Sequence, residues 1–153
     1  MAKHYDHPEM DNGRMKRVIR RTAGLGIIVC IFALVGCGLF DSGTEWKGGP
    51  YELLWIDTKE KMSIDYQLTK STSVGRIAST VFAVGWDGRF LVAKQHPNGN
   101  RAITNYYIID RQKDSPIQDP SAAVIGPLGE AEYLQRKREL HLPAFSKAVK
   151  SLQ

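Results

Sequence analysis

The stretch Ile77–Gln95, "IASTVFAVGWDGRFLVAKQ", decides the fold of this chain of 153 residues. Two runs rich in β-branched and aromatic residues lie on either side of the pair Asp87-Gly88. An Asp-Gly pair between two strand-like runs is the strongest short-range signal for a β-hairpin, because the turn residues need positive φ angles. The stretch therefore predicts two antiparallel strands, Ile77–Trp86 and Arg89–Gln95.

Three further strands are predicted around this hairpin. Tyr51–Asp57 is rich in bulky apolar residues, and Ala102–Asp110 has a dense aromatic centre. Apolar and polar residues alternate in Met62–Thr69, which predicts a strand with one buried face. The polar face of that strand consists of Ser63, Asp65, Gln67 and Thr69. Five strands with short connections predict an antiparallel meander.

The period of the apolar residues changes after the polar loop Arg111–Ser121. Glu130 and Glu132 come before a basic group at 136–138, an order that suits the dipole of a helix. Pro143 ends this helix, and three apolar residues recur behind it at helical spacing: Phe145, Val149 and Leu152. The predicted fold class is α+β: a small antiparallel β-meander of about five strands with one or two C-terminal helices packed on it, preceded by an N-terminal hydrophobic signal or anchor helix.

An apolar run without a charged residue extends from Thr22 to Phe40 and holds both cysteines of the chain, Cys30 and Cys37. Four basic residues precede it: Lys16, Arg17, Arg20 and Arg21. The run ends in a lipobox-like motif, which resembles the signal of bacterial lipoproteins and consists of Leu34, Val35, Gly36 and Cys37. This resemblance implies a signal peptide over residues 15–37, cleavage after Gly36 and acylation of Cys37, whose acyl chains anchor the protein in membrane lipid.

The alternative for the same run is an uncleaved transmembrane helix, since about 20 apolar residues span a bilayer. In both readings the basic flank stays in the cytoplasm, and the chain from Gly38 onward is extracytoplasmic, at the periplasmic face or the cell surface of a bacterium. The predicted organisation is a disordered tip or misassigned start at 1–14, the signal or anchor at 15–37, a Gly-rich tether at 38–50 and an extracytoplasmic domain at 51–153.

The formal net charge of +5 does not indicate nucleic-acid binding. The excess basic residues flank the apolar run, whereas basic and acidic residues nearly balance from Gly38 onward. Binding to nucleic acid needs a basic stripe or a stacking platform on the folded domain. No cysteine follows Cys37, which excludes a disulfide framework and a cysteine-based metal site in the domain.

The domain carries no sequence motif of catalysis, such as a nucleophile elbow, a phosphate loop or a paired-histidine zinc motif. Its two histidines, His96 and His141, are expected at the surface. We therefore predict no enzyme, no cofactor and no metal. Tyr106 and Tyr107 are neighbours in one strand and point to opposite faces. The one that is exposed or packed under the helix is the predicted binding surface.

Four short motifs together resemble a family of small bacterial lipoproteins that is described only as a domain of unknown function. They are Gly85-Trp86-Asp87, Ala93-Lys94-Gln95, the strand Tyr106–Asp110 and Gly126-Pro127-Leu128. The resemblance covers Ile77 to Pro143. It implies the fold and a lipid anchor at Cys37, and it implies no reaction.

These observations predict a membrane-anchored extracytoplasmic lipoprotein with a non-catalytic binding or envelope-associated role and a protein partner in the envelope. An immunity protein that blocks a toxin is a specific version of this role. The alternative is a single-pass membrane protein whose domain is a small-ligand sensor or carrier, with an apolar pocket between sheet and helix. An enzyme would instead need a pocket that holds His96 or His141 beside a buried carboxylate.

Overall fold

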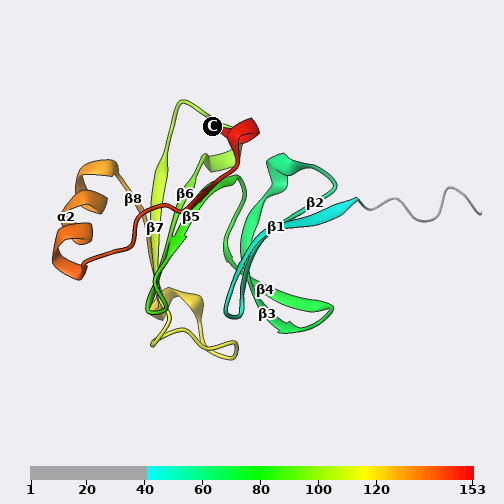
Figure 1. Ribbon diagram of the computed structural model, residues 1–153, viewed down its shortest axis with the longest axis horizontal. Coiled ribbons are helices and arrows are strands. Elements are labelled where there is room, and N and C mark those ends of the chain that lie inside the picture. The colour runs from blue at the N-terminus through cyan, green and yellow to red at the C-terminus, as the bar shows by residue number, and fades with distance from the viewer. Residues whose placement is uncertain (1–40) are drawn as a thin grey trace, which may run out of the picture. The chain divides into compact units, whose positions relative to one another are not determined.

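The structure, a computed structural model, describes residues 41–153, which fold into two antiparallel β-sheets and one α-helix (Figure 1). The first sheet has the order β1-β2-β3-β4, with β1 (Ser42–Gly48), β2 (Tyr51–Ile56), β3 (Ser63–Thr69) and β4 (Thr72–Ile77). The second has the order β8-β7-β6-β5-β9, with β5 (Val81–Trp86), β6 (Phe90–Gln95), β7 (Asn105–Asp110), β8 (Val124–Leu128) and β9 (Lys147–Ala148). Helix α2 (Glu130–Leu140) and the short 3-10 helices η1 (Lys59–Lys61), η2 (Pro97–Gly99), η3 (Pro120–Ala122) and η4 (Lys150–Leu152) complete the domain.

The α+β class is confirmed, but the prediction of one five-stranded meander was wrong. The five predicted strands correspond to β2, β3, β5, β6 and β7, which belong to two different sheets. The single strand predicted from Ile77 to Trp86 is in fact divided between the two sheets. Ile77 is the last residue of β4 in the first sheet, and β5 of the second sheet starts at Val81. Each sheet has one strongly apolar face, and two such faces stabilise each other by packing as layers.

The main core lies between the two sheets. The first sheet contributes Leu53, Ile64 and Ile77, together with Met62, which comes directly before β3. The second sheet contributes a facing set that includes Val81, Val84, Leu91 and Ile109. All of these side chains are fully or almost fully buried. Burial of a side chain of this size contributes roughly 1.5–3 kcal/mol, so this interface holds the two sheets together.

The predicted hairpin at Asp87-Gly88 is confirmed, with Trp86 opposite Leu91 in the register of β5 and β6. Its turn differs from the expected one, because only Gly88 has a positive φ angle, of 95°. The carboxylate of Asp87 accepts hydrogen bonds from the backbone N–H groups of Arg89 and Phe90, at 3.0 and 2.8 Å. These bonds close a turn of three residues instead of two.

Helix α2 covers the other face of the second sheet (Figure 1). The predicted arrangement of its charges is confirmed, with Glu130 and Glu132 in the first turn and Lys137 and Arg138 in the last. Glu132 and Arg136 approach each other to 3.8 Å one turn apart. The helix is held to the sheet by an aromatic layer in which Tyr133 stacks on a tyrosine of β7.

Residues 42–48, which the sequence analysis assigned to the tether at 38–50, form strand β1. This strand pairs with β2 over its whole length, from Ser42 opposite Ile56 to Gly48 opposite Tyr51. Trp46 explains the difference, because its ring packs on the main core and meets Trp86 edge-on, with ring centroids 6.0 Å apart. Burial of one large aromatic side chain is enough to order a short Gly-rich strand.

Of the one or two C-terminal helices predicted, the structure has one α-helix, α2, and no α-helix follows Pro143. The chain instead runs extended across β5, forms β9 opposite Ala83 and Val84, and ends in η4. Gly85 makes this crossing possible, because a Cβ at that position would meet the carbonyl oxygen of Ala144. The expected apolar residues are still buried or partly buried, since Val149, Leu152 and Phe145 all pack on the core.

The sequence predictions for the first forty residues lie outside the described part of the chain. They include the tip at 1–14, the signal or anchor at 15–37 and the lipobox residues Leu34, Val35, Gly36 and Cys37. Among residues 41–153, no helix has the length and apolar character needed to cross a membrane.

Candidate functional site

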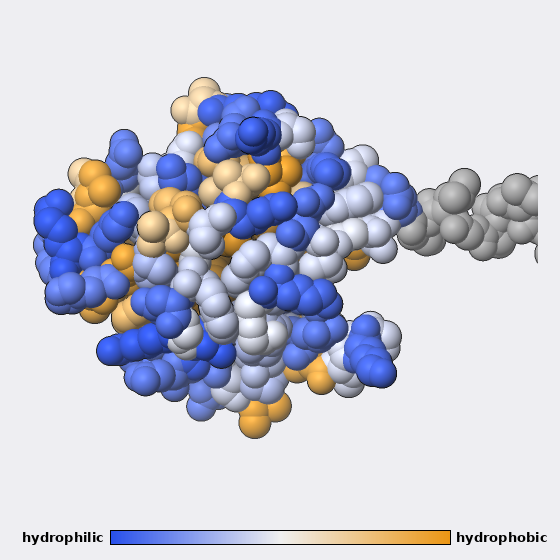
Figure 2. Space-filling model, viewed as in Figure 1, coloured by the Kyte–Doolittle hydropathy of each residue, from blue (hydrophilic) through white to orange (hydrophobic). Residues whose placement is uncertain are grey.

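The first sheet has a groove on the face that points away from the main core. In β2, Tyr51 and Leu53 point into the core, so their neighbours Glu52 and Leu54 point outward. The groove has a volume of about 520 Å³ and runs from the start of β1 to the β3–β4 hairpin. Figure 2 shows the surface hollowed between these two places. No helix of the described residues covers this face.

Most residues that line the groove are polar and uncharged. Glu52 and Lys70 are its two charged residues, and Gln67 adds an amide. The hydroxyl groups come from both ends of the groove: Ser42, Thr44, Thr69, Ser71, Thr72 and Ser73. The apolar part of the lining consists of Gly43, Leu54, Trp55 and Ile56. This lining can exchange many hydrogen bonds with a ligand and offers it one apolar contact area.

Glu52 is the unusual residue of the groove, because only 6% of it is exposed. Its carboxylate accepts a hydrogen bond from the Lys47 ammonium at 2.8 Å and from the Thr44 hydroxyl at 3.4 Å. A carboxylate this buried needs such partners, since burial of an unpaired charge costs several kcal/mol. The partners also fix the direction in which its remaining lone pairs point.

A second carboxylate lies beside Glu52 on the same face. Asp65 of β3 is directly opposite Glu52 in the register of the sheet. It accepts hydrogen bonds from the hydroxyls of Ser63 and Ser73, at 2.8 and 3.1 Å. Two carboxylates in opposite positions destabilise a sheet slightly. Lys47 offsets this repulsion at Glu52, and the two serines do so at Asp65.

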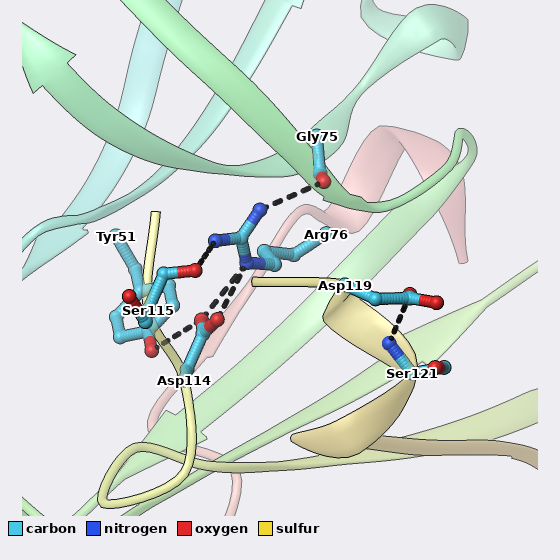
Figure 3. A network of polar contacts seen from close by, with 7 residues as sticks. All are labelled: Tyr51, Gly75, Arg76, Asp114, Ser115, Asp119 and Ser121. Carbon is cyan, nitrogen blue, oxygen red and sulfur yellow. Dashed lines mark hydrogen bonds and ion pairs between the residues drawn. The ribbon is translucent and has the colours of Figure 1, made fainter. Parts of the chain in front are cut away.

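A buried ion pair ties the long loop after β7 to the first sheet (Figure 3). Arg76 of β4 donates from Nε to both carboxylate oxygens of Asp114, at 2.9 Å, and both side chains are completely or almost completely buried. The Tyr51 hydroxyl donates to the same carboxylate at 2.7 Å. Burial and this bond raise the pKa of Tyr51 well above its ordinary value.

The same network shapes the loop that follows Asp114. The guanidinium of Arg76 also donates to the backbone carbonyl of Ser115 at 3.2 Å. At the other end of the loop, the Asp119 carboxylate accepts from the backbone N–H of Ser121 at 2.9 Å, a bond that lowers the pKa of Asp119. Both ends are therefore pinned, and the segment between them presents Ile117, which is 93% exposed. A large apolar side chain so exposed is a candidate protein contact.

The two tyrosines predicted as a binding surface lie inside the domain. They do point to opposite faces, as expected. Tyr106 is only 6% exposed and stacks on Tyr133 beneath α2, with ring centroids 4.6 Å apart. Tyr107 is half-buried against the main core, and its hydroxyl donates to the Gln95 side chain at 3.2 Å. The structure thus gives both rings a packing role and leaves neither free for a ligand.

Both histidines were expected at the surface, but only one of them lies there. His141 is exposed and ends α2 with a left-handed backbone conformation. His96 is buried, stacks on Phe82, and hydrogen-bonds through Nδ1 to the carbonyl oxygen of Ile103 at 2.8 Å. Its Nε2 atom is buried without a partner. The contact of His96 is a backbone carbonyl, so the pairing with a buried carboxylate that would indicate acid–base chemistry is not formed there.

Within residues 41–153, no three side chains of histidine, cysteine, aspartate or glutamate are arranged to hold a metal ion. The small-ligand alternative placed an apolar pocket between sheet and helix. That space is filled by an aromatic layer of Tyr106, Tyr133 and Phe145. The groove lies on the opposite side of the domain, on the sheet that carries no helix.

Sequence reasoning found part of the groove and missed the rest. The polar face of Met62–Thr69 was predicted correctly, and its residue Gln67 lines the groove. Glu52 was overlooked because it stands inside the apolar run "YELLWI". A single acidic residue in such a run is itself a signal, because charged residues are rarely buried without a partner.

A family model described as a protein of unknown function (DUF3997) matches residues 48–147. The match covers well over half of the chain and includes the whole of β2 to β8 and helix α2. The chain therefore belongs to this family. No curated protein and no solved structure shows significant similarity to it.

Proposed function

We propose that this member of the DUF3997 family is a membrane-anchored extracytoplasmic lipoprotein whose domain binds a ligand or partner without catalysis. The observation that carries the binding role is the groove on the outer face of β1–β4, with the buried carboxylate of Glu52 in its lining. A solvated sheet face that only needs to stay soluble has no reason to bury a charged group in a hollow.

The lipid anchor is supported by the sequence Leu34-Val35-Gly36-Cys37 after an uncharged apolar run and a basic flank. The structure shortens the tether that this proposal needs. Strand β1 starts at Ser42, so residues 38–41 are the whole link between an acylated Cys37 and the folded domain. Four extended residues span at most about 14 Å, which would keep the domain close to the bilayer.

The absence of catalysis is supported by the kind of groups that line the groove. Glu52 is committed to Lys47 and Thr44, and Asp65 is held by two serines. Their partners are one lysine ammonium, which forms an ion pair with Glu52, and hydroxyl groups; none of these partners is a histidine or a cysteine that could form a nucleophile–base pair. The lining groups form hydrogen bonds, which is the chemistry of recognition.

A small-ligand sensor or carrier is the second candidate, and the size of the groove favours it. Its volume of about 520 Å³ lies within the range of sites for small molecules, roughly 300–1,000 Å³. This role would use the groove on the first sheet, in place of the pocket between sheet and helix that the sequence led us to expect.

The intact mass of the membrane-extracted protein tests the anchor, with a Cys37→Ala variant as the control. We expect a mature chain that begins at an acylated Cys37 and an unprocessed variant that keeps its full length. Full-length, unacylated masses for both proteins, which differ only by the Cys37→Ala substitution, would contradict the lipoprotein and leave an uncleaved anchor. A matched Cys30→Ala variant should be processed like the natural chain, because that cysteine lies outside the lipobox.

A further inference from the structure

The charges and hydroxyl groups of the groove indicate the chemical class of its ligand. Glu52 and Lys70 line the groove with opposite charges, and the flanking pair Lys47 and Asp65 also cancels. A site with no net charge gives no electrostatic advantage to a phosphate, a nucleic acid or a polybasic chain. Its hydroxyl and amide groups both donate and accept hydrogen bonds, so they match a ligand that does the same.

The position of the groove argues against a peptide that adds a strand to the sheet. Strand addition needs the free backbone groups of an edge strand. The groove instead lies on the face of the sheet, where β2 and β3 are paired on both sides and only side chains are offered. A bulge between Thr44 and Trp46 also distorts edge strand β1, which makes it a poor template.

The buried carboxylate is suited to one ligand group in particular. Lys47 and Thr44 hold the Glu52 carboxylate in place, and a fixed carboxylate can accept two hydrogen bonds from neighbouring hydroxyls. Leu54 and Ile56 point outward along the same groove and supply an apolar contact area. Vicinal hydroxyls on one edge and C–H groups on the other are the combination that a sugar ring presents.

We propose that the groove on the outer face of β1–β4 binds a neutral oligosaccharide. Glu52 and Gln67 accept and donate the central hydrogen bonds, and the hydroxyls of the β3–β4 hairpin extend the contact to neighbouring sugar units. This inference rests on the proposed binding function and names its ligand class. It does not depend on acylation of Cys37.

The test is a fluorescence titration of the full-length, detergent-extracted protein with N-acetylchitohexaose, a neutral hexasaccharide. Trp55 borders the groove and also packs partly on the main core, whereas the chain's other two tryptophans, Trp46 and Trp86, do not border the groove. We expect a saturable change in emission that disappears in Trp55→Phe. Maltohexaose serves as a second neutral glycan, and a heparin hexasaccharide serves as the anionic comparison.

Substitutions in the lining decide whether the groove is the site. Glu52→Gln and Gln67→Ala each remove or weaken hydrogen bonds to the ligand, and each should raise the dissociation constant about tenfold. Thr58→Ala, a hydroxyl outside the groove, should leave binding unchanged. Circular dichroism of each variant checks that the domain is folded, and Gln67→Ala is the more informative variant because its side chain has no internal hydrogen bond that would stabilise the fold.

The outcomes of the titration test ligand binding independently of the lipid anchor. Saturable binding of either neutral glycan that Gln67→Ala weakens supports the inference, whatever the intact mass shows. No binding of both neutral glycans, or binding that is unchanged in Glu52→Gln and Gln67→Ala, overturns it even if Cys37 is acylated. Tighter binding of the heparin fragment overturns it as well, since a neutral groove gives an anionic glycan no advantage.

Discussion

The two sheets of the domain differ in how many of their faces are covered. Strands β5, β6 and β7 are buried on both faces, by the first sheet on one side and by α2 and the C-terminal segment on the other. Strands β1 to β4 are covered on one face and leave the other to solvent. We infer that stability is concentrated in the second sheet and in the core between the two sheets, while the free face of the first sheet is available for recognition.

The largest effect is expected where the two regions are joined, at the Arg76–Asp114 pair. Asp114→Ala leaves the Arg76 guanidinium buried without its partner, and should lower the free energy of unfolding by about 3–5 kcal/mol. Urea denaturation followed by circular dichroism measures it. The double variant Arg76→Met with Asp114→Leu should recover most of the loss, because two apolar side chains need no partner. A single variant within 1 kcal/mol of the natural chain would show that the pair does not hold the loop.

Two leucines compare the covered and the free regions directly. Leu91→Ala removes a fully buried side chain of β6 and should cost about 2–5 kcal/mol of unfolding free energy. Leu54→Ala removes a half-buried side chain of the groove and should cost about 1 kcal/mol, because less apolar area is lost. Both values come from urea denaturation of the full chain. Equal losses would contradict the distinction between the two sheets.

One substitution in the second sheet's helix-covered side, at Tyr133 of α2, should raise the free energy of unfolding instead of lowering it. Its hydroxyl is buried without a hydrogen-bond partner, so Tyr133→Phe should stabilise the domain by about 1 kcal/mol. Tyr106→Phe is the matched control and should not stabilise it, because the Tyr106 hydroxyl donates to Glu130 at 3.3 Å. Denaturation of the two variants at pH 7 distinguishes them. A loss of stability in Tyr133→Phe would show that its hydroxyl has a partner.

The same residue predicts how stability changes at alkaline pH. Burial raises the pKa of Tyr133 to about 12, so the folded state keeps a proton that the unfolded chain loses near pH 10. The stabilisation is therefore complete below pH 10 and is lost as the pH rises toward 12. Thermal unfolding at pH 8 and pH 10.5 should show a smaller drop for Tyr133→Phe than for the natural chain. An equal drop would assign the alkaline transition to other groups, such as Tyr51.

The smallest effect is expected on the free face. Gln67→Ala removes a half-buried polar side chain, and Thr69→Ala an exposed one whose hydroxyl accepts a 3.3 Å hydrogen bond from the Ser71 N–H; each should change the free energy of unfolding by at most about 0.5 kcal/mol. Urea denaturation measures both variants beside Leu91→Ala. A loss above 1.5 kcal/mol for either would mean that these side chains stabilise the sheet and that the groove is not free for a ligand.

The covered region was the easier one to predict from sequence. The β5–β6 hairpin follows from Asp87-Gly88, and α2 follows from the order of its charges, because both signals are local. Strand β1 was missed because "SGTEWKG" is polar and Gly-rich, although the following Gly49-Pro50, where Gly49 has a positive φ angle, is a turn signal. Strand β4 was missed because "TSVGRI" is short and mostly polar, as edge strands often are.

The free region could be predicted only in part. Alternation in Met62–Thr69 correctly gave a polar face, but the hollow is lined by residues of three separate segments, 42–44, 52–56 and 67–73, and no local pattern records how they come together. The Arg76–Asp114 pair is separated by 38 residues along the chain, so a single sequence gives no sign of it. The sequence left open which of Tyr106 and Tyr107 is exposed or packed under the helix, because an aromatic side chain under a helix and one at a surface have the same pattern; the structure places Tyr106 under α2.

Hydrogen–deuterium exchange of the full-length protein, with and without saturating N-acetylchitohexaose, tests the central claim most directly. We expect slower exchange of backbone amides at 42–44, 52–56 and 67–73, the segments that contain the groove residues, and unchanged exchange at 81–110 in the covered sheet. Protection confined to 81–110 or to α2, or no protection at all, would contradict the claim that the free face of the first sheet is the part of this domain that recognises a ligand.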